Sequence, residues 1–283
     1  MEPVTDPQDI LLATLRDTDR DRYLACLLSP QEKRAPLAAL YAFNAEIARV
    51  RDVVREALPG EIRLQWWRDL LEGTAHGDAG GNPVAVGLLA AIDEYRLPRD
   101  TLMAMIDARI RDLYDDPIAD RHELEGYAGE TASALIQLAS LILSAEDAPR
   151  SAEAAGHAGV AQSIAGLILL LPLHRRRGQL HVPLDILAAT GLDRDAFLAG
   201  DERDRISAAI EGFAGLGLEH LSKARRAGSV PKALFPAFLP VALVEPVLGR
   251  ALKERAAVLD HDIQPPQWRR QLRLMKAQFL QRF

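Results

Sequence analysis

The chain has 283 residues, of which 48% are hydrophobic and 26% charged, and its formal net charge is −6. This balance is typical of a soluble globular protein with a sizeable core. The single cysteine excludes an internal disulfide and fits a reducing compartment. An acidic total without a recognisable DNA- or RNA-binding motif argues against nucleic acid as a partner.

The chain shows no segment typical of export or of a membrane span. Its first residues are acidic and lack an apolar run, unlike a secretory signal or a basic transit peptide. The longest apolar stretch, from Ile164 to Leu173, is too short to cross a bilayer. We therefore expect a cytoplasmic protein that is not integral to the membrane.

Helix signals follow one another along the chain, without convincing strand alternation. Capping signals predict helix starts at Asp6-Pro7, at Ser29 with Glu32, and at Asp120 with Glu123. A helix that starts at Ser151 should break at Pro172, because proline lacks a backbone N–H. Later helices are expected over Pro183–Ala189 and 204–226, in short pieces around Pro236, Pro240 and Pro246, and after Pro265-Pro266. One all-helical domain over residues 1–283 is the simplest account.

The first long helix carries a conspicuous motif, Y-A-F-N-A-E-I-A-R-V-R-D, from Tyr41 to Asp52. Tyr41 and Phe43 are expected to pack this helix into the core. Glu46, Arg49 and Asp52 stand three residues apart, so Arg49 can pair with either carboxylate as a surface ion pair. The alternative is that these three residues line a cavity, where Arg49 contacts an anion directly.

A second conspicuous segment runs from Gln162 to His174 and continues into three arginines. One interpretation is a solvated helix end, since cations favour helix C-termini. The other is an anion site, because arginine binds phosphate through two parallel hydrogen bonds. The residues of such a site would be Arg49, Arg51, His174, Arg175, Arg176 and Arg177.

Residues 266–283 predict a basic amphipathic helix, in which apolar side chains recur every three or four residues. Residues 267–283 hold five cations and no acid, which leaves −11 for the rest of a chain whose total is −6. We expect the apolar side to pack on the body, with attachment to anionic lipid or to a partner as the alternative. That surface would contain Trp268, Arg269, Arg270, Arg273 and Lys276.

The first motif resembles the first signature of the squalene/phytoene synthase family, Y-A-F-C-R-x-x-D-D-x-x-D. In that family, two aspartate-rich clusters hold Mg²⁺ against the diphosphate of a prenyl substrate. Here the carboxylates of the first cluster fall on Ala48, Arg49 and Asp52, and those of the second on Leu170, Leu173 and His174. The resemblance implies an all-α isoprenoid-synthase-type bundle around a central cavity. Because both metal motifs are degenerate, we expect neither a metal nor another cofactor.

Within that family, the chain is most similar to the branch that contains the mitochondrial complex I assembly factor and its bacterial relatives. The shared motifs are A-F-N-x-E-x-A-x-V from Ala42, R-x-Q-W-W from Arg63, and P-x-H with basic residues from Pro172. This resemblance implies a non-catalytic helper at the inner membrane surface, with respiratory-complex assembly proteins as partners and a prenyl diphosphate or lipid as a candidate ligand. Two alternatives stay open. One is a prenyltransferase that joins two prenyl diphosphates at a metal-free or relocated site with Arg49, Arg51 and Arg175 to Arg177, and Mg²⁺ is expected only in this case. The other is a peripheral lipid-binding protein that uses the last helix.

Overall fold

The computed structural model describes residues 7–74, 79–114 and 116–283, and this part of the chain is helical without a strand. Its α-helices are α1 (Pro7–Thr18), α2 (Arg20–Leu27), α3 (Arg34–Ala48), α4 (Val50–Val53), α5 (Ala57–Glu72), α6 (Pro83–Tyr95), α7 (Arg99–Arg111), α8 (Arg121–Ala128), α9 (Ala134–Leu143), α10 (Ala152–Arg176), α11 (Leu184–Ala189), α12 (Arg194–Ala199), α13 (Arg203–Arg226), α14 (Phe235–Phe238), α15 (Val244–Glu254) and α16 (Gln267–Leu280). Short 3-10 helices cover Gln31–Lys33, Ala79–Gly81, Ala148–Ser151, Lys232–Leu234, Leu239–Leu243 and Arg255–Leu259, and a π-helical segment covers Gly129–Ser133. The predicted all-α class is confirmed.

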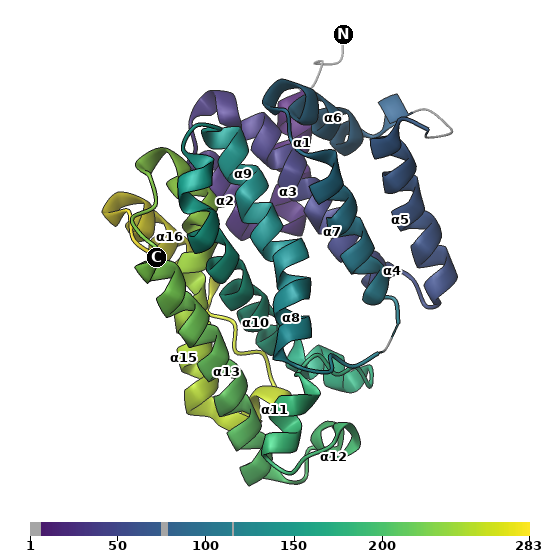
Figure 1. Ribbon diagram of the computed structural model, residues 1–283, viewed down its shortest axis with the longest axis vertical. Helices are drawn as coiled ribbons and strands as arrows, with labels where there is room; N and C mark the ends of the chain where they lie inside the picture. The colour runs from purple at the N-terminus through teal and green to yellow at the C-terminus, as the bar shows by residue number, and fades with distance from the viewer. Residues whose placement is uncertain (1–6, 75–78, 115) are drawn as a thin grey trace.

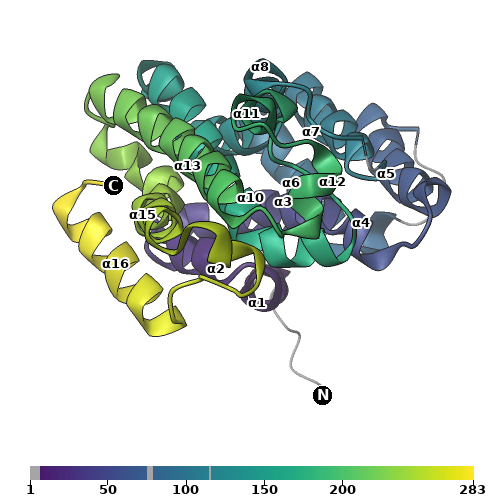
Figure 2. The same ribbon diagram turned by 90° about the horizontal axis from the view of Figure 1, so that it is seen from below.

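Helix α10 runs through the middle of the molecule, with other helices on several sides of it (Figure 1). It packs against α13 and α15, against α8 and α9, and against the π-helical segment. Helix α3 packs against α1 and α6 and reaches α9. Helices α5 and α16 lie at opposite edges of the molecule in both views (Figures 1 and 2). The two helices that carry the conspicuous motifs are therefore both part of the packed interior.

The aromatic residues of the first motif are core residues, as the sequence predicted. Tyr41 and Phe43 are buried, and the Phe43 ring meets the Trp67 ring edge-on with 5.0 Å between centroids. Trp67 is buried, whereas its neighbour Trp66 is only partly covered. Cys26 is also fully buried, and burial raises the pKa of its thiol.

One predicted capping signal is confirmed and another is wrong. Asp120 begins α8, where its carboxylate accepts a hydrogen bond from the Glu123 backbone N–H at 2.9 Å. Ser29 does not form the predicted capping box, because its hydroxyl donates to the Ala25 carbonyl at 2.8 Å. Helix α3 therefore begins at Arg34 without a side-chain cap, after a 3-10 turn.

The predicted break at Pro172 is wrong, because α10 continues through this residue to Arg176. Proline removes one backbone hydrogen bond from a helix. Leu171 and Pro172 are both buried in the core, and this packing offsets the lost bond. Asp6, the predicted cap of the first helix, lies outside the described residues.

Two helical stretches are long and apolar enough to cross a membrane, which corrects the expectation that none is. They are Ala148–Arg176 and Lys232–Leu259. In the most apolar window of each, 56% and 67% of the residues respectively are buried inside the protein. The second stretch also consists of short 3-10 and α-helical pieces. Core helices of globular proteins pass the same test, so both stretches are weak evidence for a membrane span.

Gly159 lets α10 approach the π-helical segment closely. A Cβ atom at Gly159 would lie 2.3 Å from the backbone N of Ser133 and 2.4 Å from its Cα. The Ser133 hydroxyl donates to the Gly156 carbonyl of α10 at 2.8 Å, so the same contact is also hydrogen-bonded. Because backbone lies on both sides of this contact, neither side can move cheaply to admit a larger residue.

We predict that Gly159→Ala lowers the free energy of unfolding by about 1–3 kcal/mol, because overpacking pushes α10 away from the π-helical segment. Gly156→Ala is the matched control in the same helix, since a Cβ there meets no atom within 4 Å. That control should be neutral or should stabilise by up to about 1 kcal/mol. Urea unfolding followed by circular dichroism measures both variants. Equal stabilities would contradict the close-approach argument.

Candidate functional site

The two motif segments line one small cavity of about 130 Å³. The first motif contributes Ala48, at the end of α3, and Asp52 in α4. Helix α10 contributes Leu170, Leu173 and His174. The fold thus brings together the positions at which the resemblance places the two carboxylate clusters.

An ion pair joins the two segments at this cavity. Arg177, just after the end of α10, donates through Nη1 to Oδ1 of Asp52 at 2.6 Å. The carboxylate that remains from the first cluster is therefore neutralised by a guanidinium. The pairing of Asp52 with Arg49 that the sequence allowed does not form, and Arg49 makes no ion pair within the described residues.

Arg109, Asp112 and Tyr127 form a hydrogen-bonded wall of the same cavity. Arg109 donates to Asp112 at 3.0 Å and to the Tyr127 hydroxyl, which itself donates to Asp112 at 2.9 Å. Burial raises the pKa of Tyr127, so its hydroxyl stays protonated. The Nε of Arg109 is buried without a hydrogen-bond partner in the described part of the chain. Sequence reasoning missed Arg109 and Asp112 because α7 carries several similar charged residues.

His174 is buried in the cavity wall and is not a cation at neutral pH. Burial, reinforced by His181 and Arg177, lowers its pKa from 6.5 to about 3. Its ring lies edge-on to that of His181 with 4.3 Å between centroids, and its Nδ1 has no hydrogen-bond partner among the described residues. His174 can therefore hydrogen-bond to a ligand as a neutral imidazole, and it does not add the positive charge expected of a residue in the predicted anion site.

The other residues of the predicted anion site are separated by the fold. Arg51 lines the small cavity, whereas Arg175 and Arg176 do not. Arg175 instead donates to the carbonyls of Leu198 and Ala199 at 2.9 and 2.5 Å, which is a structural role. Arg176 is exposed. Anion binding by the arginines that do line the cavity stays a prediction.

The side chains at the former carboxylate positions do not fit a Mg²⁺ cluster. Mg²⁺ demands near-octahedral oxygen ligands. Apart from Asp52, these positions hold alkyl, guanidinium and imidazole groups. Across the described ranges, no group of three or more His, Cys, Asp or Glu residues is placed to hold a metal.

A larger cavity of about 400 Å³ adjoins the small one. The residues that line both are Ala48, Arg109, Tyr127, Leu167 and Leu170. Thr131 of the π-helical segment, Leu135 of α9 and Gln162 of α10 extend the larger cavity. The leucines that replace the second carboxylate cluster therefore do not fill the centre of the bundle, and a hollow remains beside the degenerate motifs.

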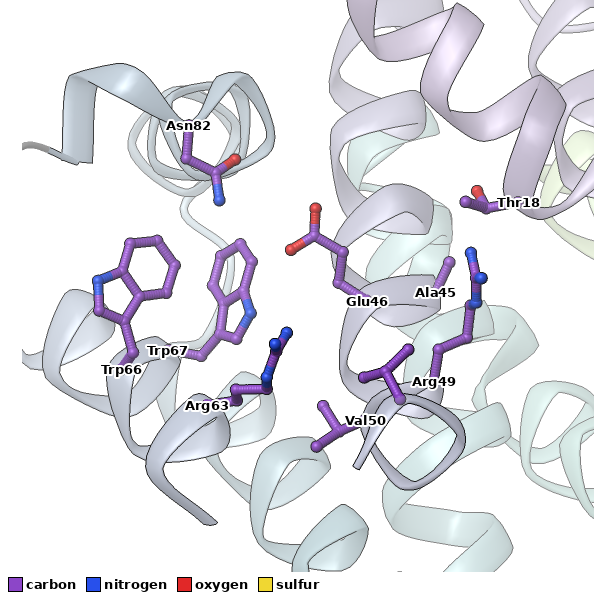
Figure 3. Close-up of a pocket in the computed structure, with 10 residues that line it drawn as sticks. Thr18, Ala45, Glu46, Arg49, Val50, Arg63, Trp66, Trp67 and Asn82 are labelled. Carbon is purple, nitrogen blue, oxygen red and sulfur yellow. The ribbon is translucent and has the colours of Figure 1, made fainter. Parts of the chain in front are cut away.

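Glu46 and Arg49 line a different pocket of about 440 Å³ (Figure 3). It lies between the end of α3 and α5, with Trp66 and Trp67 on one side and Asn82 at the start of α6. Burial raises the pKa of the Glu46 carboxyl, which forms no ion pair in the part of the chain that the structure describes. Arg49 also lines the hollow of about 400 Å³, so the polar residues of the first motif are divided among three pockets.

The last helix, α16, is oriented differently from our main expectation. Its large apolar side chains Trp268, Leu272, Met275 and Phe279 are exposed instead of packed on the body. The helix contacts the body through its opposite face, where Leu274 is buried and Arg270 and Arg273 bind neighbouring groups. Of the other predicted surface residues, Arg269 and Lys276 are exposed.

Comparison with known proteins supports a family assignment. The family model described as squalene/phytoene synthase matches residues 15–275. The human protein named NADH dehydrogenase (ubiquinone) complex I, assembly factor 6 is 34% identical over 240 residues, which span 84% of this chain and 72% of the human protein.

Two solved structures share the fold. A dehydrosqualene synthase in complex with ligand aligns with a TM-score of 0.78 at 16% identity, covering 97% of this chain and 96% of its own. The squalene synthase HpnC from Alicyclobacillus acidocaldarius aligns with a TM-score of 0.73 at 19% identity, covering 88% and 94%. At these identities the likeness extends to the fold alone, and it confirms the predicted isoprenoid-synthase-type bundle.

We predict that acidification destabilises the protein through His174. The folded state holds this imidazole neutral down to about pH 3, whereas an ordinary histidine takes up a proton near pH 6.5. Its contribution is therefore complete above pH 6.5 and is lost as the pH falls toward 3, by at most about 1.4 kcal/mol per pH unit. His174→Asn should flatten the fall in unfolding free energy between about pH 7 and pH 5. The control, His122→Asn at an exposed position of α8, should keep the wild-type slope; equal slopes in both variants would refute the assignment.

Proposed function

The chain belongs to the squalene/phytoene synthase family, in the branch of the complex I assembly factor, and from this premise we propose that it is a non-catalytic assembly factor for respiratory complex I. The observation that carries the non-catalytic part is the ion pair between Asp52 and Arg177. It lies where the two aspartate-rich clusters of a synthase would face each other. The assembly part rests on the name of the human relative.

The chemistry of prenyl transfer supports the non-catalytic role. Diphosphate can leave an allylic carbon only if its developing negative charge is stabilised, and metal ions supply this in the family. In this chain the corresponding cavity holds two carboxylates, and both already accept hydrogen bonds: Asp52 from Arg177, and Asp112 from Arg109 and Tyr127. A metal ion placed at Asp52 would compete with the Arg177 guanidinium and would meet the alkyl groups of Ala48 and Leu170.

The cavity supports a binding role in place of catalysis. The hollow of about 400 Å³ adjoins a wall in which Asp52 and Asp112 are hydrogen-bonded within the chain, while Arg109 Nε and His174 Nδ1 have no partner among the described residues. We propose that an isoprenoid or lipid tail occupies this hollow, or that partner binding reshapes it, during assembly of the complex. Respiratory-complex assembly proteins are the proposed partners.

The alternative is prenyl transfer without metal, in which arginines would hold the diphosphate. Arg177 is already paired with Asp52, and Arg175 is bound to backbone carbonyls on another side of α10. Of the arginines that this mechanism needs, Arg175 and Arg177 are thus engaged elsewhere, whereas Arg51 lines the small cavity and Arg49 lines the adjoining hollow.

We predict that the purified chain forms no squalene- or phytoene-like product from farnesyl or geranylgeranyl diphosphate, with or without Mg²⁺ and NADPH, because the leaving group finds no metal site. Mass spectrometry beside an active synthase measures this. A metal-independent product that disappears in Arg177→Gln would instead establish the prenyltransferase alternative.

We predict that deletion of the gene lowers the amount of assembled complex I, measured by native electrophoresis and NADH–quinone oxidoreductase activity of the membranes. Asp52→Asn and Arg177→Gln should each restore assembly like the wild type, because a half-exposed ion pair contributes at most about 1 kcal/mol and holds no metal. Normal complex I after deletion would contradict the assembly role. Failure of Asp52→Asn alone, with the protein folded, would contradict the non-catalytic role.

A further inference from the structure

One helix presents a row of large apolar side chains to solvent. On α16, Trp268, Leu272, Met275 and Phe279 form an outer ridge, with exposed fractions of 57%, 54%, 46% and 86%. The spacing of four, three and four residues places all of them on one side of the helix. Figure 2 shows α16 at the edge of the molecule, away from the central helix α10. Scattered exposed apolar residues are ordinary, but a continuous row marks an interaction surface.

The other side of α16 fixes the outer ridge in this direction. Leu274 and Ala277 are buried in a small cluster with residues of α2 and α14. Arg270 binds Asp21 of α2 through two hydrogen bonds, at 3.1 and 2.6 Å. Arg273 donates to the Ala242 carbonyl at 2.7 Å. Turning the ridge inward would break these contacts, so its exposure is built into the fold.

Positive charge accompanies the outer ridge. Arg269, Lys276 and Arg282 are exposed and form no ion pair within residues 7–74, 79–114 and 116–283. Residues outside 267–283 carry a formal net charge of −11. An anionic surface therefore attracts this end of the protein and repels the remainder, which orients the molecule with α16 toward that surface.

A groove of about 450 Å³ lies beside the ridge, between α16 and the start of α15. Leu243 and Val247 give it an apolar wall, and Arg269, Arg273 and Lys276 line its other side. Apolar surface next to several cations matches a phospholipid, in which acyl chains and a phosphate are joined in one molecule.

We propose that α16 docks the protein on the surface of an anionic phospholipid bilayer. The helix lies parallel to the membrane, with the outer ridge between the acyl chains and headgroups and with Arg269, Lys276 and Arg282 at the phosphates. A second copy of the chain fits this face less well, because two such faces in a symmetric dimer would bring their cations together. The inference is independent of the proposed assembly role.

Vesicle flotation tests the proposal. The full chain should bind phosphatidylcholine vesicles that contain phosphatidylglycerol and should bind pure phosphatidylcholine vesicles at least about tenfold more weakly. Leu272→Ser with Phe279→Ser should weaken binding about a hundredfold, since each buried side chain contributes roughly a factor of ten. The matched control is Leu58→Ser with Ile62→Ser on α5, at side chains exposed by 65% and 62%. This control should bind like the wild type.

Two further measurements separate electrostatic attraction from insertion. Arg269→Gln with Lys276→Gln should weaken binding about twentyfold, and salt should weaken the wild type more than this variant. The fluorescence of the wild type should shift to the blue on binding, and this shift should be lost in Trp268→Phe, because Trp66 and Trp67 belong to α5 at the opposite edge of the molecule. The Trp268→Phe variant should still bind.

The proposal is overturned if the folded wild type does not bind anionic vesicles, or if the α16 variants bind as well as the α5 control. Circular dichroism and melting temperature establish that each variant is folded. Analytical sedimentation tests whether a second copy of the chain, instead of a membrane, occupies the ridge. A dimer of the wild type that is lost with Phe279→Ser, without vesicle binding, would assign the ridge to contact between copies of this chain.

Discussion

Gly159 allows α10 to lie directly against the backbone of the π-helical segment, and the position of the second motif follows from that contact. On its other sides α10 packs against α13 and α15, so its C-terminal half is held beside the end of α3 and α4. The two motif segments therefore meet whether or not they carry metal ligands. Helix packing sets the relative position of the two motif segments. A few side chains on these helices set the chemistry of the site. Such a scaffold can lose its reaction while it keeps its cavity.

The two carboxylates around the small cavity are both hydrogen-bonded to groups of the chain itself. Clustered carboxylates repel one another unless a cation joins them, and in a metal-dependent site that cation is the metal ion. Here Asp52 is neutralised by Arg177, and Asp112 accepts hydrogen bonds from Arg109 and Tyr127. A hollow that Arg49 and Leu170 help to line remains beside these two carboxylates.

The sequence predicted the all-helical bundle and the facing motif segments, because the aromatic residues of the first motif keep their place in the core. Local signals failed where tertiary contacts outweigh them. The Ser29 hydroxyl donates to a carbonyl of α2 instead of capping α3. Helix α10 continues past Pro172 because this part of the helix is buried in the core. The ion pair between Asp52 and Arg177 spans 125 residues in a chain with many cations, so no sequence pattern singles it out. Periodicity showed which residues of α16 share a face, but not which face turns to the body, since both faces carry apolar side chains.

The burial of Cys26 has a practical consequence for spectroscopy. It is the one cysteine of the chain, its side chain is fully enclosed by the core, and burial keeps its thiol protonated. Thiol reagents attack through the thiolate, so this residue is shielded both sterically and chemically. A cysteine introduced anywhere on the surface would then be labelled selectively in the native protein. Spin labels or fluorophores can thus be attached one position at a time, with the natural thiol left in place.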